Sequence, residues 1–105
     1  MHEHFPIREI NDQSPDFPSP LKQITRPPKN IWIQGKESAF ELFSRLPEDG
    51  FAVVGTRAPQ RRCLDLTDQV ISELQGSKLI IISGLARGID QKAHEVALQA
   101  GLPTI

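Results

Sequence analysis

Two stretches of the sequence decide its fold: Phe51-Ala52-Val53-Val54-Gly55 and Leu79-Ile80-Ile81-Ile82-Ser83-Gly84. Each begins with a continuous apolar run, which ends at Gly55 in the first stretch and at Ser83-Gly84 in the second. Such a run is typical of a strand buried on both faces of a parallel sheet. Residues 62–75 and residues 90–100 place their apolar side chains at helical spacing. The order strand, helix, strand, helix is that of an open parallel sheet with right-handed crossovers, so we predict an α/β fold.

Glycines mark the ends of the two predicted helices. Gly76-Ser77 stops the first helix and Gly101 caps the second. Residues 102–105 then resemble the first residues of a third strand. Two strands and the beginning of a third would leave a long apolar edge uncovered, so we expect the remainder of the sheet to lie beyond Ile105.

The first third of the chain has a different character. Residues 1–30 hold most of the nine prolines and show no sustained period, which predicts a proline-rich extended arm. The apolar residues of this arm favour packing against other parts of the protein, and a flexible leader over residues 1–12 is the alternative. Residues 31–33 predict a short strand, and residues 37–46 predict a helix that ends at a turn. We therefore divide the chain into the arm and an α/β domain over residues 31–105.

The composition excludes several classes of protein. With 105 residues the chain is one domain at most, and its 24% charged and 38% apolar residues are ordinary for a globular protein. No apolar stretch approaches the roughly 20 residues of a membrane helix, and residues 1–6 lack the pattern of a secretory signal. The single cysteine, Cys63, cannot form an internal disulfide, which fits a cytoplasmic protein. The net charge of −1 does not indicate a partner.

Two loops at the carboxyl ends of the predicted strands carry the candidate chemistry: Gly55-Thr56-Arg57 and residues 83–88. Ligands of open parallel sheets bind at this edge. Glycine lets the backbone approach a ligand, and arginine can grip a phosphate with two hydrogen bonds. Amides at the start of the second helix would add positive potential. We therefore predict one shared phosphate site, with turn glycines and solvated surface arginines as the plainer alternative.

Three further residues near these loops could carry chemistry. Asp90 is better explained as the N-cap of its helix than as a catalytic acid. His94, one turn later, is structural or a phosphate neighbour, and two such residues without a third ligand are weak evidence for a metal. Cys63 lies beside Arg61 and Arg62 with no evident base, so an inert thiol is the better interpretation. We predict no catalytic residue, no metal site and no cofactor.

The loop sequences match a pattern known from one family. The run Ser83-Gly84-Leu85-Ala86-Arg87-Gly88-Ile89-Asp90, with Ala93-His94 and Ala97-Leu98 after it, closely resembles the signature of the DNA-processing protein A (DprA/Smf) family. Val53-Val54-Gly55-Thr56-Arg57 is similar to the first Rossmann-like strand and loop of that family. The lead-in is similar at Pro18-Ser19-Pro20-Leu21, Pro27-Pro28 and Ile31-Trp32-Ile33-Gln34-Gly35. The chain departs from the family where a serine and an aromatic-glycine pair are usual, at Gln60, Arg62 and Cys63.

The resemblance, which covers residues 16–105, implies a partial, extended Rossmann-like fold that binds single-stranded DNA at a basic pocket. It implies a non-enzymatic role in natural transformation, in which the protein protects incoming DNA, loads RecA recombinase and acts as a homodimer. Binding should be driven by phosphate contacts, with some base stacking. By this resemblance the DNA-binding residues are Gly55, Thr56, Arg57, Ser83, Gly84, Arg87 and Gly88.

The resemblance leaves other parts of the site unassigned. No stacking residue is identifiable near the loops, because the chain has no tyrosine and its phenylalanines lie upstream of them. The lysine-bearing wall of the pocket, the dimer surface and the RecA-contacting region are expected beyond Ile105. A chain that ends there is expected to lack complete DNA binding.

Two alternatives to DNA binding are kept. A protein of a related Rossmann-like fold could bind a nucleotide-derived small molecule or hydrolyse a nucleoside phosphate, but the Pro-Gly-Gly-x-Gly-Thr-x-x-Glu loop of such ribohydrolases is absent. The chain also lacks Gly-x-Gly-x-x-Gly and Gly-Lys-Ser/Thr motifs, so a dinucleotide dehydrogenase and a P-loop hydrolase are not supported. A truncated gene product that retains only a structural remnant is the other alternative.

Overall fold

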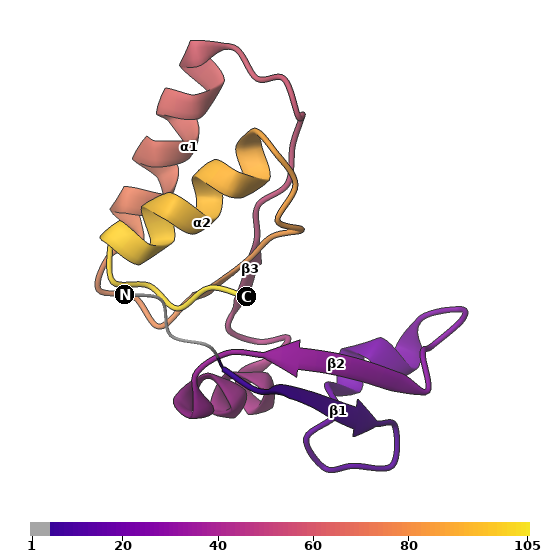
Figure 1. Ribbon diagram of the computed structural model, residues 1–105. Helices are drawn as coiled ribbons and strands as arrows, with labels where there is room; N and C mark the ends of the chain where they lie inside the picture. The colour runs from indigo at the N-terminus through magenta and orange to yellow at the C-terminus, as the bar shows by residue number, and fades with distance from the viewer. Residues whose placement is uncertain (1–4) are drawn as a thin grey trace. The chain divides into compact units, whose positions relative to one another are not determined.

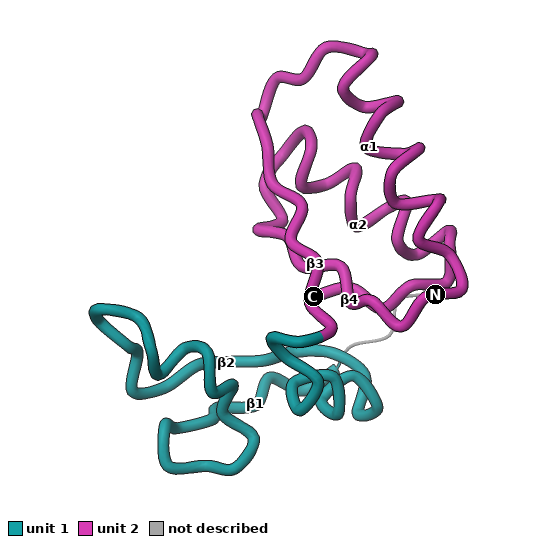
Figure 2. Tube along the Cα trace, turned by 180° about the vertical axis from the view of Figure 1, so that it is seen from behind, with its two compact units in different colours: residues 1–48 teal, residues 49–105 magenta. Residues whose placement is uncertain are grey.

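The computed structural model describes residues 5–105, which form two compact units (Figures 1 and 2). The first unit reaches to Glu48, and the second runs from Asp49 to Ile105. The elements of the second unit are strand β3 (Gly50–Ala52), helix α1 (Arg61–Glu73), strand β4 (Ile80–Ile82) and helix α2 (Ile89–Gln99). The predicted order of strand, helix, strand and helix is confirmed.

The strands of the second unit form a parallel sheet. Phe51 of β3 pairs with Ile81 of β4, and Thr104 makes a parallel bridge to the same Ile81. The Ile105 amide donates to the carbonyl oxygen of Ile81 at 2.8 Å. β4 therefore lies between β3 and the last residues of the chain, where a third strand was predicted to begin. The continuation of the sheet beyond Ile105 stays a prediction.

The core of the second unit lies between the helices and the sheet. α1 and α2 pack against each other on one side of β3 (Figure 1). The buried members of the core are Ile71, Ile81, Ala93, Val96, Ala97 and Leu102. Full burial of one large aliphatic side chain contributes about 1.5–3 kcal/mol, so this cluster holds both helices to the sheet. The turns after α1 and α2 pass through Gly76 and Gly101, as predicted.

β3 is not buried on both faces, contrary to the prediction from its sequence. Ala52 is exposed, and Val54 is 73% exposed. Successive residues of a strand point to opposite faces. Because both helices lie on one side of β3, every second side chain of this stretch faces away from them. Leu66 and Val70 of α1 are exposed as well, so the apolar stripe predicted for this helix is wider than the face that it buries.

The first unit is built on a two-stranded antiparallel ribbon. β1 (Ile7–Asn11) pairs with β2 (Asn30–Gln34), and a short 3₁₀ helix, η1 (Ser19–Gln23), lies in the chain between them. A second 3₁₀ helix, η2 (Glu37–Arg45), follows β2 where a helix was predicted. None of the helices between residues 5 and 105 is long and apolar enough to span a membrane.

The ribbon joins residues from both sides of the predicted boundary between the arm and the α/β domain. Residues 31–33 were assigned to the α/β domain, yet β2 pairs with residues 7–11 of the predicted arm. The run Ile7-Arg8-Glu9-Ile10 does not alternate strictly between apolar and polar residues, so it carries no clear strand signal. The compact units divide after Glu48, and the division into an arm and an α/β domain stays a prediction. The first four residues of the arm lie outside the described residues.

Candidate functional site

The two predicted loops meet at one buried carboxylate. Asp90, in the first turn of α2, is 5% exposed. Its Oδ1 atom accepts a hydrogen bond from the Gly55 amide at 3.2 Å, and its Oδ2 atom accepts one from the Gly84 amide at 3.0 Å. One side chain thus ties together the loops that follow β3 and β4. The two loops are neighbours, as the strand order predicted.

Asp90 is not the N-cap of α2, which corrects the prediction from the sequence. The helix begins at Ile89, and its capping position is Gly88 with a φ of 84°. A side chain inside the first turn of a helix points back toward the N-terminus, where the two strand ends lie. There the carboxylate receives two charge-assisted hydrogen bonds from the loops, and the helix dipole favours its negative charge.

Three glycines allow the loops to close on α2. A Cβ atom at Gly84 would lie 2.9 Å from Oδ2 of Asp90, and one at Gly55 would lie 2.8 Å from Cβ of Ile89. A Cβ atom at Gly88 would collide with the backbone of the first loop, and the positive φ of this residue also favours glycine. Close packing therefore requires glycine at all three positions, beyond the plain turn role that the sequence left open.

Three hydrogen-bond donors that we expected to contact a ligand are already bonded within the chain. The amides of Gly55 and Gly84 already donate to Asp90. The Ser83 hydroxyl donates to the carbonyl oxygen of Val53 at 2.6 Å. These three donors hold the loops in shape and are therefore not available to a phosphate.

Three polar side chains of the same loops are exposed: Thr56, Arg57 and Arg87. Within residues 5–105 neither guanidinium takes part in a hydrogen bond or an ion pair. The backbone of Arg57 lies against Gly88, next to Arg87, so both arginines leave the chain at adjacent points. We call these three residues the loop rim. We call the residues beneath them the loop framework, which consists of Gly55, Ser83, Gly84, Gly88 and Asp90.

The first turn of α1 carries the residues at which the chain departs from the DprA/Smf pattern. Arg61 Nε lies 3.2 Å from Oδ1 of Asp65, an exposed pair that contributes about 0.3–0.5 kcal/mol. Arg62 is exposed. Cys63 is a free, half-buried thiol on the wall of an open apolar groove of about 430 Å³ between β3 and α1.

His94 ties α2 to the last residues of the chain. Its Nδ1 atom lies 2.7 Å from Oγ1 of Thr104, and the Thr104 hydroxyl donates to the carbonyl oxygen of Ile81 at 3.0 Å. Because the hydroxyl has one proton, this arrangement puts the ring proton on Nδ1. The Nε2 atom is buried without a hydrogen-bond partner among the described residues. These contacts support the structural alternative for His94, and residues 5–105 contain no group of three side chains that could hold a metal.

Leu85 is a residue of the second loop that the sequence did not single out. Its φ is 60°, and it is 76% exposed. The left-handed conformation costs a residue other than glycine about 1–2 kcal/mol. Strained backbone of this kind concentrates at functional sites. No local sequence signal marks it, because leucine rarely adopts a positive φ.

Residues 9–105 match a known protein family, described as DNA recombination-mediator protein A. The DNA processing protein DprA of Streptococcus pneumoniae is 36% identical over 101 residues, which cover 96% of this chain and 33% of that protein. Protein Smf of a Synechocystis strain is 33% identical over 96 residues, which cover 91% of this chain and 24% of that protein.

A solved structure has the same fold. The X-ray structure of DprA from Streptococcus pneumoniae matches with a TM-score of 0.78 at 34% identity, over 95% of this chain and 32% of that one. The predicted Rossmann-like α/β fold is therefore confirmed. The chain spans about a quarter to a third of the length of the relatives that it matches.

Proposed function

This chain belongs to the DNA recombination-mediator protein A family, and from that premise we propose that its two glycine loops bind single-stranded DNA. The observation that carries the proposal is the loop rim, where Arg57 and Arg87 leave adjacent points of the backbone with no partner among the described residues. A guanidinium binds a phosphate with two hydrogen bonds in a fixed geometry. Such contacts give affinity for a DNA strand without dependence on its sequence.

The seven predicted site residues take two roles in this proposal. Thr56, Arg57 and Arg87 contact the sugar-phosphate backbone. Gly55, Ser83, Gly84 and Gly88 line the same DNA-binding site and hold the rim in place. Each phosphate neutralised on a single strand contributes about −0.7 to the slope of log K against log salt concentration, so two arginine contacts contribute about −1.4.

For the whole protein we propose a non-enzymatic role in natural transformation. The protein would bind incoming single strands in the cytoplasm, protect them and load RecA recombinase onto them, acting as a homodimer. The family description, DNA recombination-mediator, and the relatives named for DNA processing support DNA as the polyanion. The buried carboxylate of Asp90 already accepts hydrogen bonds from two backbone amides of the loops, which favours a structural role for Asp90 over a catalytic one.

A titration of dye-labelled oligo-dT, followed by fluorescence anisotropy at several salt concentrations, tests the proposal. We expect saturable binding that weakens steeply as salt rises. Hydrogen bonds to charged groups contribute about 1.5–3 kcal/mol, so Arg57→Ala and Arg87→Ala should each weaken binding about tenfold or more. Arg61→Ala is the control. It also removes one positive charge, but the guanidinium of Arg61 is already paired with Asp65, so this variant should change binding little. Equal affinities of the Arg57→Ala and Arg61→Ala variants would contradict the proposed site.

The second candidate, a binder of nucleotide-derived small molecules or a nucleoside-phosphate ribohydrolase, is not favoured by the family match. Incubation of the protein with nucleoside monophosphates, followed by chromatography, distinguishes it from the first. Release of the free base would support the enzyme, whereas intact nucleotides together with oligo-dT binding would support the DNA-binding protein.

A further inference from the structure

The ribbon of the first unit exposes an indole on one of its faces. Trp32 lies opposite Glu9, and Gln34 lies opposite Ile7. Because cross-strand partners and alternate residues share a face, these four side chains project on the same side. Trp32 is 64% exposed and Ile7 is 65% exposed. Tryptophan is highly buried on average in folded proteins, so this ring needs an explanation that packing within the described chain does not give.

The other face of the ribbon does the packing. Ile10, on the face opposite to Trp32, is 4% exposed. Arg8, whose side chain is also directed to this face, pairs with Asp16 at 3.6 Å and with Glu37 at 3.7 Å. The two faces of the ribbon therefore differ. On the packed face Arg8 is paired with acidic side chains, and the open face carries the indole.

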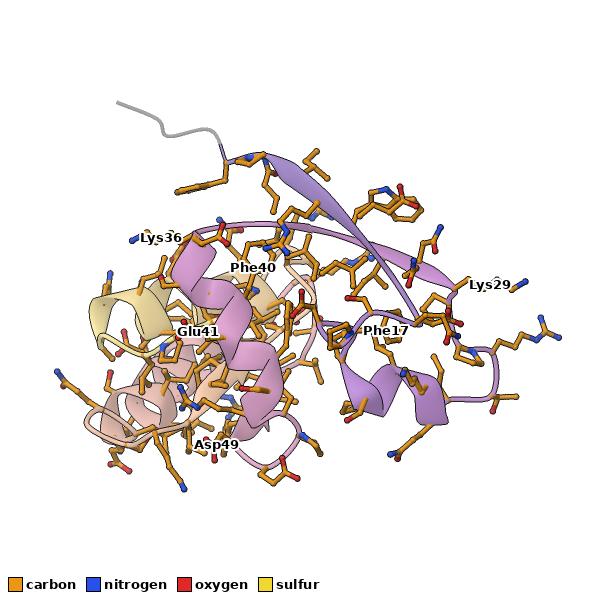
Figure 3. The ribbon with its side chains drawn as sticks, turned by 90° about the horizontal axis from the view of Figure 1, so that it is seen from below. Phe17, Lys29, Lys36, Phe40, Glu41 and Asp49 are labelled. Carbon is orange, nitrogen blue, oxygen red and sulfur yellow. The ribbon has the colours of Figure 1, made fainter. Side chains whose placement is uncertain are left out.

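Two lysines flank the indole along the chain. Lys29 immediately precedes β2, and Lys36 follows its last residue by two positions. Figure 3 shows them at opposite ends of this strand, and both are exposed. Neither ammonium group forms an ion pair with any residue between 5 and 105. An exposed aromatic ring between unpaired cations is the combination with which proteins bind single-stranded nucleic acids, since the ring stacks on a base and the cations attract phosphates.

One carboxylate lies beside the ring. Glu9 is the cross-strand partner of Trp32, and its Oε1 atom accepts a hydrogen bond from Asn30 Nδ2 at 2.8 Å. A carboxylate repels a phosphate, but it can accept the N–H group of a base. Glu9 therefore favours a base over a phosphate directly on the ring, while the two lysines favour phosphates on either side of it.

We propose that Trp32 is a base-stacking subsite for single-stranded DNA, flanked by phosphate contacts from Lys29 and Lys36. This inference rests on the proposed function and extends it, because the glycine loops offer phosphate contacts but no aromatic ring. It assigns to the first unit the stacking that the sequence could not place. A base stacked on an aromatic side chain strengthens binding by a factor of about 5 to 150.

The protein carries its own reporter for the test, because Trp32 is its one tryptophan and it has no tyrosine. Dye-labelled oligo-dT reports binding by anisotropy, and in parallel titrations with unlabelled oligo-dT the emission of Trp32 reports stacking. We expect the emission to be quenched in step with the anisotropy. An abasic oligomer of the same length should bind through its phosphates without quenching the indole.

Variants separate the ring from other apolar surface. Trp32→Ala should weaken oligo-dT binding by the factor given above, whereas Trp32→Phe should keep most of the affinity because it keeps an aromatic face. Ile24→Ala, which removes another exposed apolar side chain of the same unit, should bind as the unaltered protein does. Circular dichroism checks that each variant is folded, and the quenching experiment on the unaltered protein stands if Trp32→Ala is not.

The outcomes distinguish this inference from the function on which it rests. If oligo-dT binds but the emission does not change, or changes equally with the abasic oligomer, the subsite is overturned and the proposed function stands. If oligo-dT does not bind, the proposed function fails and the subsite fails with it. If the indole is already shielded from acrylamide before DNA is added, a protein segment covers it and the subsite is overturned.

Discussion

The loop framework and the loop rim share the same two loops but differ in how their polar groups are satisfied. In the framework, the Asp90 carboxylate, the amides of Gly55 and Gly84 and the Ser83 hydroxyl all have partners within the chain. In the rim, Arg57 is exposed and has no such partner among residues 5–105. A buried polar group destabilises the fold when its partner is removed, whereas an exposed one is free to bind a ligand.

We infer from this difference that the framework residues stabilise the fold and that the rim residues bind the ligand. Substitutions in the framework should change the free energy of unfolding, and substitutions in the rim should change the affinity for DNA. The comparison fails if a framework variant unfolds like the unaltered protein, or if a rim variant loses stability instead of affinity.

Asp90→Asn is expected to have the largest effect, because it breaks the framework at its centre. The asparagine oxygen can keep one of the two amide bonds, but its NH₂ group would then face the other amide donor. Hydrogen bonds to a charged group contribute about 1.5–3 kcal/mol each, so we expect the free energy of unfolding to fall by about 3 kcal/mol. Urea denaturation followed by circular dichroism measures this change.

Asp65→Asn is the matched control for Asp90→Asn. It makes the same chemical change at a carboxylate that is exposed and, among residues 5–105, is paired only with Arg61. Its expected cost is below about 0.5 kcal/mol, as for other exposed helix pairs. Equal losses for the two variants would show that Asp90 does not hold the loops together.

Gly84→Ala is expected to have the next largest effect, since its Cβ atom would lie 2.9 Å from Oδ2 of Asp90. Overpacking of this kind typically costs about 1–3 kcal/mol. Gly35→Ala is the control, because a Cβ atom there would meet nothing within 4 Å. Urea denaturation should show a loss for the first variant and none for the second, and a similar stability of both would contradict the close packing.

The features that the sequence predicted are those written in local patterns. The apolar run before Gly84 indicates a strand, Gly101 indicates a helix end, and both predictions are confirmed. The position of the two loops also followed from the sequence, because the carboxyl ends of parallel strands meet at one edge of a sheet.

The features that the sequence did not predict depend on contacts between distant residues. The bond from Gly55 to Asp90 joins residues 35 positions apart, so a local rule assigned Asp90 to the N-cap instead. The exposure of Val54 depends on which side of β3 the helices cover. The strand at residues 7–11 lacks clear alternation and is fixed by its pairing with β2.

A double variant, Arg57→Ala with Arg87→Ala, tests the rim side of the comparison. We expect the slope of log K against log salt to become shallower by about 1.4, because two phosphate contacts are lost at about 0.7 each. The free energy of unfolding should stay within about 0.5 kcal/mol of the original value, as for other surface changes. Anisotropy titrations with oligo-dT and urea denaturation give the two quantities.

The control for the double variant is Arg61→Ala with Arg62→Ala, which removes two positive charges from the neighbouring first turn of α1. If only total charge matters, this control should reduce the salt slope equally. An equal reduction of the salt slope would show that Arg57 and Arg87 contribute no more to DNA binding than other basic residues near the loops.

Variants of Leu85 are expected to have the smallest effect, and they test whether Leu85 acts with the framework or with the rim. Leu85→Gly should relieve the left-handed strain of about 1–2 kcal/mol, offset by about 0.5–1 kcal/mol for the greater freedom of glycine in the unfolded chain. We therefore expect a net stabilisation of about 0.5–1 kcal/mol in urea denaturation. Leu85→Ala removes most of the side chain but keeps the strain, so it should gain nothing.

The same two variants separate the backbone of Leu85 from its side chain in binding. The side chain is 76% exposed in the loop that carries Arg87, so we expect it to act with the rim. Both variants should then weaken oligo-dT binding by a similar small factor, although only the glycine variant is more stable. Unchanged binding in both would leave Leu85 without a role in the rim, and equal stability of both would show that its backbone conformation carries no strain.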